Sequence, residues 1–506
     1  MNQVFKLFIF PLAIIACIGG GSIYTELNNI FLYQSKYSID PKTMNWFYFA
    51  VTASNLFGIV PSRLYSAFGP KKTILIGGIL LTIAHVTAAL IIDANLSKNA
   101  ATALLFTIGI LGGQGACIIF LSSLGAMHKL HSTVCSCLIN GILLAYLLGS
   151  DTFHAVLKYG VFPDLSYKQF LLVIAGFGAL AYVACAILFQ KKKQKEQGTK
   201  SITKGIALKK SVLLYALIQA LYLTLVTLLS VTNQLDSYWG SRLLVFVLAI
   251  NIFIPGIALL LMKNTSFKGM SPSETDRFLS QRGKNCNFKD ARTKSEFWLF
   301  SISFGILAGV SIMVDENQSD ISLNNVQRSQ YNRKTYALFE VLGAFSSGLF
   351  LSFFRIYVST YGLFMFNCFL LVVSQFLLFF IDLSSMALFV SVVIAGFVNG
   401  SSFMIAGQIA IEDYGAKHFS KMLGIFFTAA GVGMLLFDEL MFSYMYYWFN
   451  LQDESQGRNY YGRWNKYIFL ITILSSGLAF VMSIAAFAKT RKTDGNKDKI
   501  SDFVNF

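Results

Sequence analysis

The stretch 19–29, inside the first apolar segment, carries the side chains best suited to chemistry. It opens with three consecutive glycines and continues through Tyr24, Glu26 and Asn28. Glycines let a neighbouring helix backbone approach closely, whereas a carboxylate, a phenol and an amide are too polar to face lipid. We therefore expect these side chains to face protein or a water-filled cavity. Glu26 is a candidate proton carrier or substrate contact, and a structural pair near the membrane edge is the alternative.

A related polar run appears in the later half of the chain, where Gly309 is followed by Asp315, Glu316, Asn317 and Gln318. Two adjacent acids point about 100° apart on a helix, so at most one of Asp315 and Glu316 faces a cavity squarely. We expect one of them to contribute to a binding site, or both to cap the end of a short span. The two polar runs are predicted to face each other across a central cavity.

Other polar residues within apolar segments extend the candidate cavity lining. Amides in membrane helices hold neighbouring helices together as well as contact substrates, so both roles stay open for them. The aromatic side chains Tyr24, Tyr48 and Tyr146 are candidates for the same lining. The remaining candidates for the substrate or proton cavity are Gln114, Asp151, Glu340, Asn399 and Asp438.

Two isolated histidines, His85 and His154, fit either a proton relay or a packing role. The seven cysteines are scattered, and the pair Cys135 and Cys137 has neither a second pair nor a histidine at zinc spacing, so we interpret the cysteines as packing residues. The sequence offers no nucleophile–base pair, metal-ligand spacing or nucleotide motif. We therefore predict no enzyme activity, no metal site and no cofactor.

The composition is that of a chain embedded in a membrane. Hydrophobic residues make up 55% and charged residues only 13%, with a mean hydropathy of +0.59. Such a chain cannot hide its apolar surface in one aqueous core. The net charge of +16 sits in short clusters between apolar runs, which fits the positive-inside rule rather than a nucleic-acid-binding face. The Lys and Arg distribution places both termini on the more basic side.

Segments of about 20 apolar residues predict fourteen transmembrane helices, arranged as six, two and six. The predicted organisation is an N-terminal six-helix half at 1–190, a basic linker with two extra helices and a loop at 191–295, a C-terminal six-helix half at 296–488, and a polar tail at 489–506. The predicted helices are 4–33, 43–67, 72–93, 101–127, 132–157, 168–190, 211–231, 240–262, 296–317, 335–357, 360–381, 386–411, 419–448 and 464–488.

The two six-helix halves repeat one another weakly but in order. Gly109 and Gly113 match Gly396 and Gly400, and Asp151 matches Asp438 in the same way. Ordered matches of this kind indicate an internal duplication. Two parallel six-helix halves are the architecture of the major facilitator fold, in which substrates bind near mid-membrane between the halves. We therefore predict an all-α integral membrane protein of this fold, with two extra central helices.

The chain also resembles the nodulin-like branch of the major facilitator superfamily. The resembling segments in the first half are 23–27, 46–49, 55–58 and 70–77, and the second half resembles the family at 295–299 and 305–309. One departure concerns the loop between the second and third helices, where the family carries an acid followed by arginine and this chain has Ser66 and Ala67. Members of this branch also tend to be degenerate at this loop.

The resemblance implies a secondary transporter of a small solute that works by alternating access, with proton coupling as one option. The prevalence of acids over bases within the predicted helices favours a cationic or neutral solute. The alternative is a transporter-fold protein that serves as a non-transporting structural subunit of a larger membrane complex, for instance a mitochondrial one. The lost acid–arginine pair favours this alternative.

The expected partners are a small-molecule solute, the lipid bilayer and, under the alternative, other membrane subunits. The basic segment Lys191–Lys210 is expected to contact anionic lipid head groups. No nucleic-acid partner is predicted. The plasma membrane and an organelle membrane, such as the mitochondrial inner membrane, both fit the sequence.

Overall fold

The computed structural model describes residues 3–23, 30–130, 136–150, 153–154, 157–189, 288–321, 326–354, 358–380, 385–445 and 463–504. Within these residues the regular elements are helices and no strand occurs. Four predicted site residues lie outside the described residues, namely Tyr24, Glu26, Asn28 and Asp151. The predicted lipid-binding segment, the two extra helices and most of the loop that follows them also lie outside the described residues.

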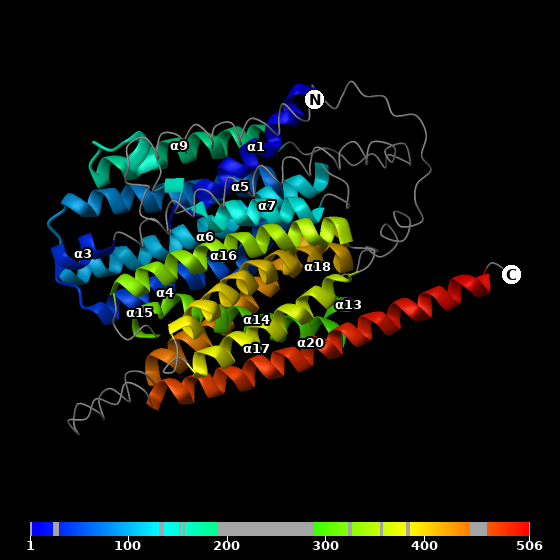
Figure 1. The fold of residues 1–506 in the computed structure, drawn as a ribbon. Helices are drawn as coiled ribbons and strands as arrows, with labels where there is room; N and C mark the ends of the chain where they lie inside the picture. The colour runs from blue at the N-terminus through cyan, green and yellow to red at the C-terminus, as the bar shows by residue number, and fades with distance from the viewer. Residues whose placement is uncertain are drawn as a thin grey trace.

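The described helices before residue 190, here called the N-terminal half, lie beside those after residue 287, the C-terminal half (Figure 1). The N-terminal half consists of α1 (Gln3–Gly20), α3 (Ile30–Tyr37), α4 (Pro41–Leu56), α5 (Ile59–Asp93), α6 (Lys98–Leu130), α7 (Ser136–Leu148), the π-helical η2 (Leu157–Val161) and α9 (Tyr167–Leu188). The C-terminal half consists of α13 (Phe288–Ala291), α14 (Ser295–Glu316), α15 (Gln318–Ile321), α16 (Val326–Phe354), α17 (Thr360–Phe379), α18 (Ser385–Met434), the π-helical η6 (Leu435–Ser443) and α20 (Arg463–Val504).

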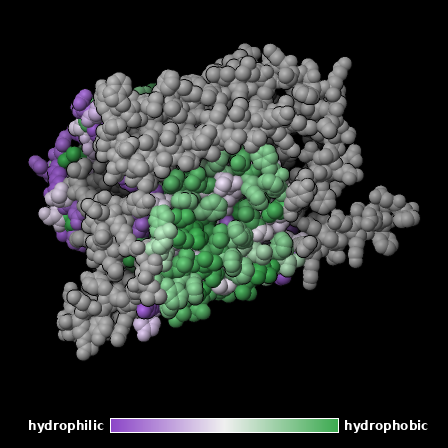
Figure 2. All heavy atoms as spheres, in the orientation of Figure 1, coloured by the Kyte–Doolittle hydropathy of each residue, from purple (hydrophilic) through white to green (hydrophobic). Residues whose placement is uncertain are grey.

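Among the described residues, nine helices are long and apolar enough to cross a membrane, and Cys137–Leu148 adds a shorter apolar helix. Many large apolar side chains point outward from the bundle, including Phe366, Phe376 and Leu474. Figure 2 shows such side chains forming a continuous hydrophobic face. The chain is therefore a multi-pass integral membrane protein, as predicted. The total of fourteen helices stays a prediction.

Two glycines make sharp corners between consecutive helices. Gly69 divides α5 with φ 72° and ψ 175°, and Gly415 divides α18 with φ 71° and ψ 164°. Side chains other than glycine rarely adopt this left-handed backbone, so glycine lets each pair of helices join without a longer loop. Both corners lie on what we call the basic side of the bundle, next to Lys71, Lys72 and Lys421.

On the opposite side, local signals begin the helices. Asp40 caps the start of α4 by accepting hydrogen bonds from the hydroxyl and the backbone amide of Thr43, and Pro41 occupies the first helical turn. These bonds hold the pKa of the Asp40 carboxyl below its ordinary value. Ser166 caps α9 in the same way, reciprocated by Gln169.

The three consecutive glycines of the first helix each meet a different helix. A Cβ added at Gly19 would meet the Tyr182 hydroxyl of α9 at 2.6 Å, and one at Gly20 would meet Ile119 of α6 at 3.4 Å. A Cβ at Gly21 would overlap Ser150, just beyond α7. The predicted close approach of neighbouring helices at this triplet is confirmed.

The matched glycines of the two halves hold equivalent helix pairs together. In the N-terminal half, Gly109 and Gly113 of α6 pack against α4. In the C-terminal half, Gly396 and Gly400 of α18 pack against the backbone of α16. In each half the glycines therefore bring the fourth predicted helix onto the second, which is the arrangement expected from an internal duplication.

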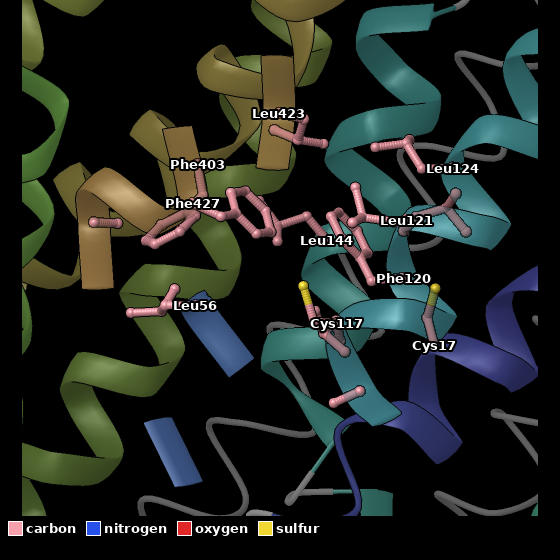
Figure 3. Packing of buried hydrophobic residues seen from close by; sticks show 14 of the residues in the cluster. Cys17, Leu56, Cys117, Phe120, Leu121, Leu124, Leu144, Phe403, Leu423 and Phe427 are labelled. Atoms are coloured by element: carbon pink, nitrogen blue, oxygen red, sulfur yellow. The ribbon is translucent and has the colours of Figure 1, made fainter. Parts of the chain in front are cut away.

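The halves meet along a seam that is apolar in its interior. Small residues bring backbones together at Gly58 and Gly424 and again at Gly141 and Gly348. Between these contacts the rings of Phe120 and Phe427 stack with centroids 6.0 Å apart. Figure 3 shows this pair surrounded by leucines from both halves. Aromatic and leucine side chains thus seal the seam at this level.

The close approach of α18 to α16 makes a stability prediction. A Cβ at position 400 would overlap the backbone oxygen of Glu340, whereas one at Gly477 of α20 meets nothing within 4 Å. We expect Gly400→Ala to destabilise the purified protein by about 2 kcal/mol, because the two helices must move apart. Thermal unfolding in detergent measures this. Gly477→Ala is the matched control, and equal unfolding temperatures for both variants would contradict the packing argument.

Candidate functional site

Several acids of the C-terminal half gather at the side of the bundle opposite the basic corners. Helix α14 starts at Ser295, whose hydroxyl accepts a hydrogen bond from Lys489 near the end of the apolar part of α20. Its 22 residues span about 33 Å, which is the thickness of a bilayer core. Asp315 and Glu316 therefore lie at the opposite membrane face from Ser295.

Asp438 joins these acids from the π-helical segment η6. The Asn317 side-chain amide donates a 2.6 Å hydrogen bond to the Asp438 carboxylate, which is 5% exposed. Asp438 also interacts electrostatically with Asp315, Glu316 and Glu439. Because π-helical turns add a residue to the helix repeat, they re-aim side chains and are frequent at functional sites.

Tyr336 of α16 lies at the centre of the group. Its ring is buried and its hydroxyl donates to the Ser311 carbonyl oxygen at 3.1 Å. The phenol interacts electrostatically with Asp315, Glu316 and Glu340. One turn further along α16, Glu340 accepts a 2.7 Å hydrogen bond from the Asn399 amide of α18.

Together Asp315, Glu316, Glu340, Asn399 and Asp438 form what we call the acidic cluster. Five of the ten predicted site residues are thus brought together in one half. Glu340 lies eight residues into the described apolar part of α16, so the cluster extends about 12 Å inward from the membrane face.

The structure adds Arg333 to this group. Its guanidinium lies 3.3 Å from the Glu316 carboxylate and 6.0 Å from the centre of the Tyr48 ring, which belongs to α4 of the N-terminal half. This contact links the acidic cluster to the other half by a cation–π interaction. The predicted helix 335–357 leaves Arg333 outside the membrane, because the apolar run begins only at 335. Helix α16 begins at Val326, about two and a half turns before residue 335, and an arginine two residues ahead of an apolar run is the signal that was available.

Gln114 lies apart from the cluster and holds helices together. Its amide nitrogen donates to the carbonyl oxygens of Ser54 and Phe57, where α4 ends and its carbonyls lack helical partners. The predicted meeting of Glu26 with Asp315 or Glu316 concerns a residue outside the described part of the chain, so it stays a prediction.

On the basic side, neutral polar groups cross the seam. The Ser66 and Ser420 hydroxyl oxygens lie 3.3 Å apart, and the Asn140 amide donates to Gln408 at 3.2 Å. Gln408 in turn donates to Glu412, which also accepts from the Thr360 hydroxyl.

The chemical capacity of the acidic cluster follows from its charges. Four carboxylates lie near a single described arginine, so the site favours a proton or a cationic group over an anion. Within the described residues, no group of three or more His, Cys, Asp or Glu side chains is placed to hold a metal ion.

The Arg333–Glu316 pair predicts a measurable coupling energy. The Glu316 side chain is 19% exposed, so Arg333→Met leaves a mostly buried carboxylate without its cation. We expect Arg333→Met and Glu316→Gln to be non-additive by about 1 kcal/mol in a double-mutant cycle of unfolding. The exposed pair Lys168 and Asp93 is the control, with expected coupling near zero. Additive losses at Arg333 and Glu316 would show that the pair contributes nothing.

Comparisons with known proteins bear on the fold. No protein-family model and no curated protein matches the sequence. Among solved structures, the chain is similar to a bacterial homologue of the iron transporter ferroportin in its outward-facing state, with 12% identity, a TM-score of 0.56 and coverage of 95% of this chain and 99% of that one. It is also similar to a proton:xylose symporter of the major facilitator superfamily, with 10% identity, a TM-score of 0.54 and coverage of 94% of each chain. The chain therefore has the fold of the major facilitator transporters.

Proposed function

We propose that this protein is a secondary transporter that moves a small cationic or neutral solute by alternating access. The observation that carries the proposal is the difference between the two ends of the seam. At one end the acidic cluster reaches inward from the membrane face, and at the other end apolar and neutral polar contacts hold the halves together. In this proposal the acidic cluster binds solute or protons while the basic side is closed.

Rocking of the halves requires contacts that break at modest cost. The Ser66–Ser420 pair and the stacked Phe120 and Phe427 rings carry no net charge. Separating them exposes no unpaired buried ion, so opening the basic side avoids a large desolvation cost. At the opposite end, Arg333 contacts both Tyr48 across the seam and Glu316 within its own half, so it can lose Tyr48 and keep Glu316 as the halves separate.

The finer assignments belong to the same proposal. The moving bodies are the halves at 1–190 and 296–488, with 191–295 as an inserted unit and 489–506 as a tail. We also propose that the chain is related to the nodulin-like branch. The segment Lys191–Lys210 is proposed to contact anionic lipids. The comparisons give no support to the alternative of a structural subunit in a larger membrane complex.

Uptake into proteoliposomes tests the solute class. We expect a panel of cationic, neutral and anionic solutes to show uptake of a cationic or neutral member. Asp438→Asn and Glu340→Gln are expected to reduce that uptake at least about tenfold, because each removes a charge-assisted contact. Asp93→Asn is the matched control, since this acid is 63% exposed and pairs with Lys168 outside the cluster. Absence of uptake for every solute, or equal loss in the control, would contradict the proposal.

Alternating access makes a separate prediction at the basic side. Replacing both Ser66 and Ser420 with cysteine places two thiols where the hydroxyl oxygens are 3.3 Å apart. Oxidation is expected to join the halves and abolish uptake, and a reductant is expected to restore it. The single cysteine variants are the controls, because the five described native cysteines are buried. Full uptake in the cross-linked protein would show that the seam does not open there.

A further inference from the structure

A buried polar group inside the N-terminal half has no part in the acidic cluster. It consists of Ser22, His85, Ser150 and His154, whose exposed fractions lie between 0 and 3%. Helix α1 ends at Gly20, and Ser22 lies in the turn that follows. His85 belongs to α5, and the other two residues lie just beyond α7. Burying polar side chains at membrane depth costs free energy, so such a group is a candidate functional site.

The hydrogen bonds of His85 fix where its protons lie. Its Nδ1 atom is 2.7 Å from the Leu81 carbonyl oxygen, which can only accept, so Nδ1 carries a proton. Its Nε2 atom is 2.8 Å from the Ser22 hydroxyl oxygen. That hydroxyl oxygen is also 2.6 Å from the Gly19 carbonyl oxygen, a distance typical of O–H···O hydrogen bonds.

A neutral His85 cannot satisfy all three contacts. With its proton on Nδ1, its Nε2 atom is an acceptor that takes the single hydroxyl proton of Ser22. The oxygens of Ser22 and Gly19 would then lie 2.6 Å apart with no proton between them. If Nε2 is protonated as well, it donates to Ser22, and Ser22 donates to Gly19. We propose that His85 is a proton-binding site whose imidazolium form is held by Leu81, Ser22 and Gly19.

The end of α1 supplies a favourable field for this charge. The carbonyl groups of the last helical turn carry the negative pole of the helix dipole, and cations are stabilised next to them. Ser22 connects the His85 ring to that turn through the Gly19 carbonyl oxygen. Gly19 and Gly21 press against Tyr182 and Ser150, so the close packing of α1 fixes this arrangement.

His154 provides an internal comparison. Its Nδ1 atom also lies close to the carbonyl oxygen four residues earlier, at 2.6 Å from Ser150. Unlike the Nε2 atom of His85, its Nε2 atom shows no hydrogen bond to a side chain within the described residues. His154 also interacts electrostatically with His85, which disfavours two charges. We therefore expect His154 to stay neutral.

On α1 and α9, Cys17, Tyr182 and Cys185 carry no charge at neutral pH and lie nearer the basic side than His85 does. The charged groups at the opposite end of α5 include Asp93, which pairs with Lys168 of α9, and Lys36 of α3, which donates to the Ile92 carbonyl oxygen. Asp93 lies about two helical turns beyond His85 along α5. Glu26 follows Ser22 by four residues in the sequence and lies outside the described residues. If the protein is a transporter as proposed, His85 makes the proton its coupling ion, and this step rests on the proposed function. Proton binding at His85 itself does not depend on transport.

Solid-state nitrogen NMR of ¹⁵N-histidine-labelled protein in lipid bilayers tests the proton site without any transport assay. The chain has only five histidines, and His85→Gln and His154→Gln assign the signals of these two. We expect both ring nitrogens of His85 to be protonated at pH 6, and His154 to show one protonated and one unprotonated nitrogen. A singly protonated His85 at pH 6 would overturn the proposal, whatever the uptake result.

The variant Ser22→Ala removes the acceptor from Nε2. We expect the ratio of charged to neutral His85 at fixed pH to fall about tenfold, as for loss of one hydrogen bond to a charged group. Ser150→Ala is the matched control, because it removes a buried hydroxyl from the same group without touching the His85 ring. Equal changes in both variants, or no change in Ser22→Ala, would show that Ser22 does not hold the proton.

Discussion

Polar groups within the membrane must find their partners inside the protein, because hydrocarbon offers none. This constraint accounts for the placement of the charged side chains in the described C-terminal half. Asp438 is bonded to Asn317, Glu340 to Asn399 and Glu316 to Arg333. Each pair joins two different helical segments. Forming these polar contacts therefore also holds the bundle together.

These pairs can form only where backbones come close, and glycine makes that approach possible. Gly400 lies against the carbonyl of Glu340, next to the bond between Glu340 and Asn399. In the N-terminal half, Gly21 lies against Ser150 beside the bond between His85 and Ser22. In both halves, therefore, a small residue brings two helices together at the level where a buried polar contact forms. Without a hydrophobic driving force between helices in lipid, packing and hydrogen bonding together supply the association.

The sequence predicts the architecture better than the site. Apolar length identifies the membrane-crossing parts of the described helices, although α16 begins nine residues before the predicted 335 and α20 continues sixteen residues beyond the predicted 488. The ordered glycine matches indicate the internal duplication. The acids Asp315, Glu316 and Asp438 are visible as carboxylates in apolar segments, which the membrane rarely tolerates. Arg333 could not be predicted as a site residue in this way, because it precedes the apolar run that begins at 335. Helix α16 starts earlier, at Val326, and so includes Arg333. Which helices face each other across the seam depends on tertiary packing, so Tyr48 could be predicted as a lining residue but not as a partner of Arg333.

The two ends of the seam also differ in how their contacts respond to separation. At the basic side the halves meet through Ser66 with Ser420 and through aromatic stacking, and these groups can be hydrated one by one as the seam widens. At the opposite side Arg333 keeps Glu316 as a partner even if Tyr48 moves away, since both charges belong to the C-terminal half. The ion pair therefore remains intact while the cation–π contact across the seam is lost. Separation of the halves at either end therefore leaves neither Arg333 nor Glu316 unpaired, and avoiding an unpaired buried charge is an energetic requirement for rocking about a buried centre.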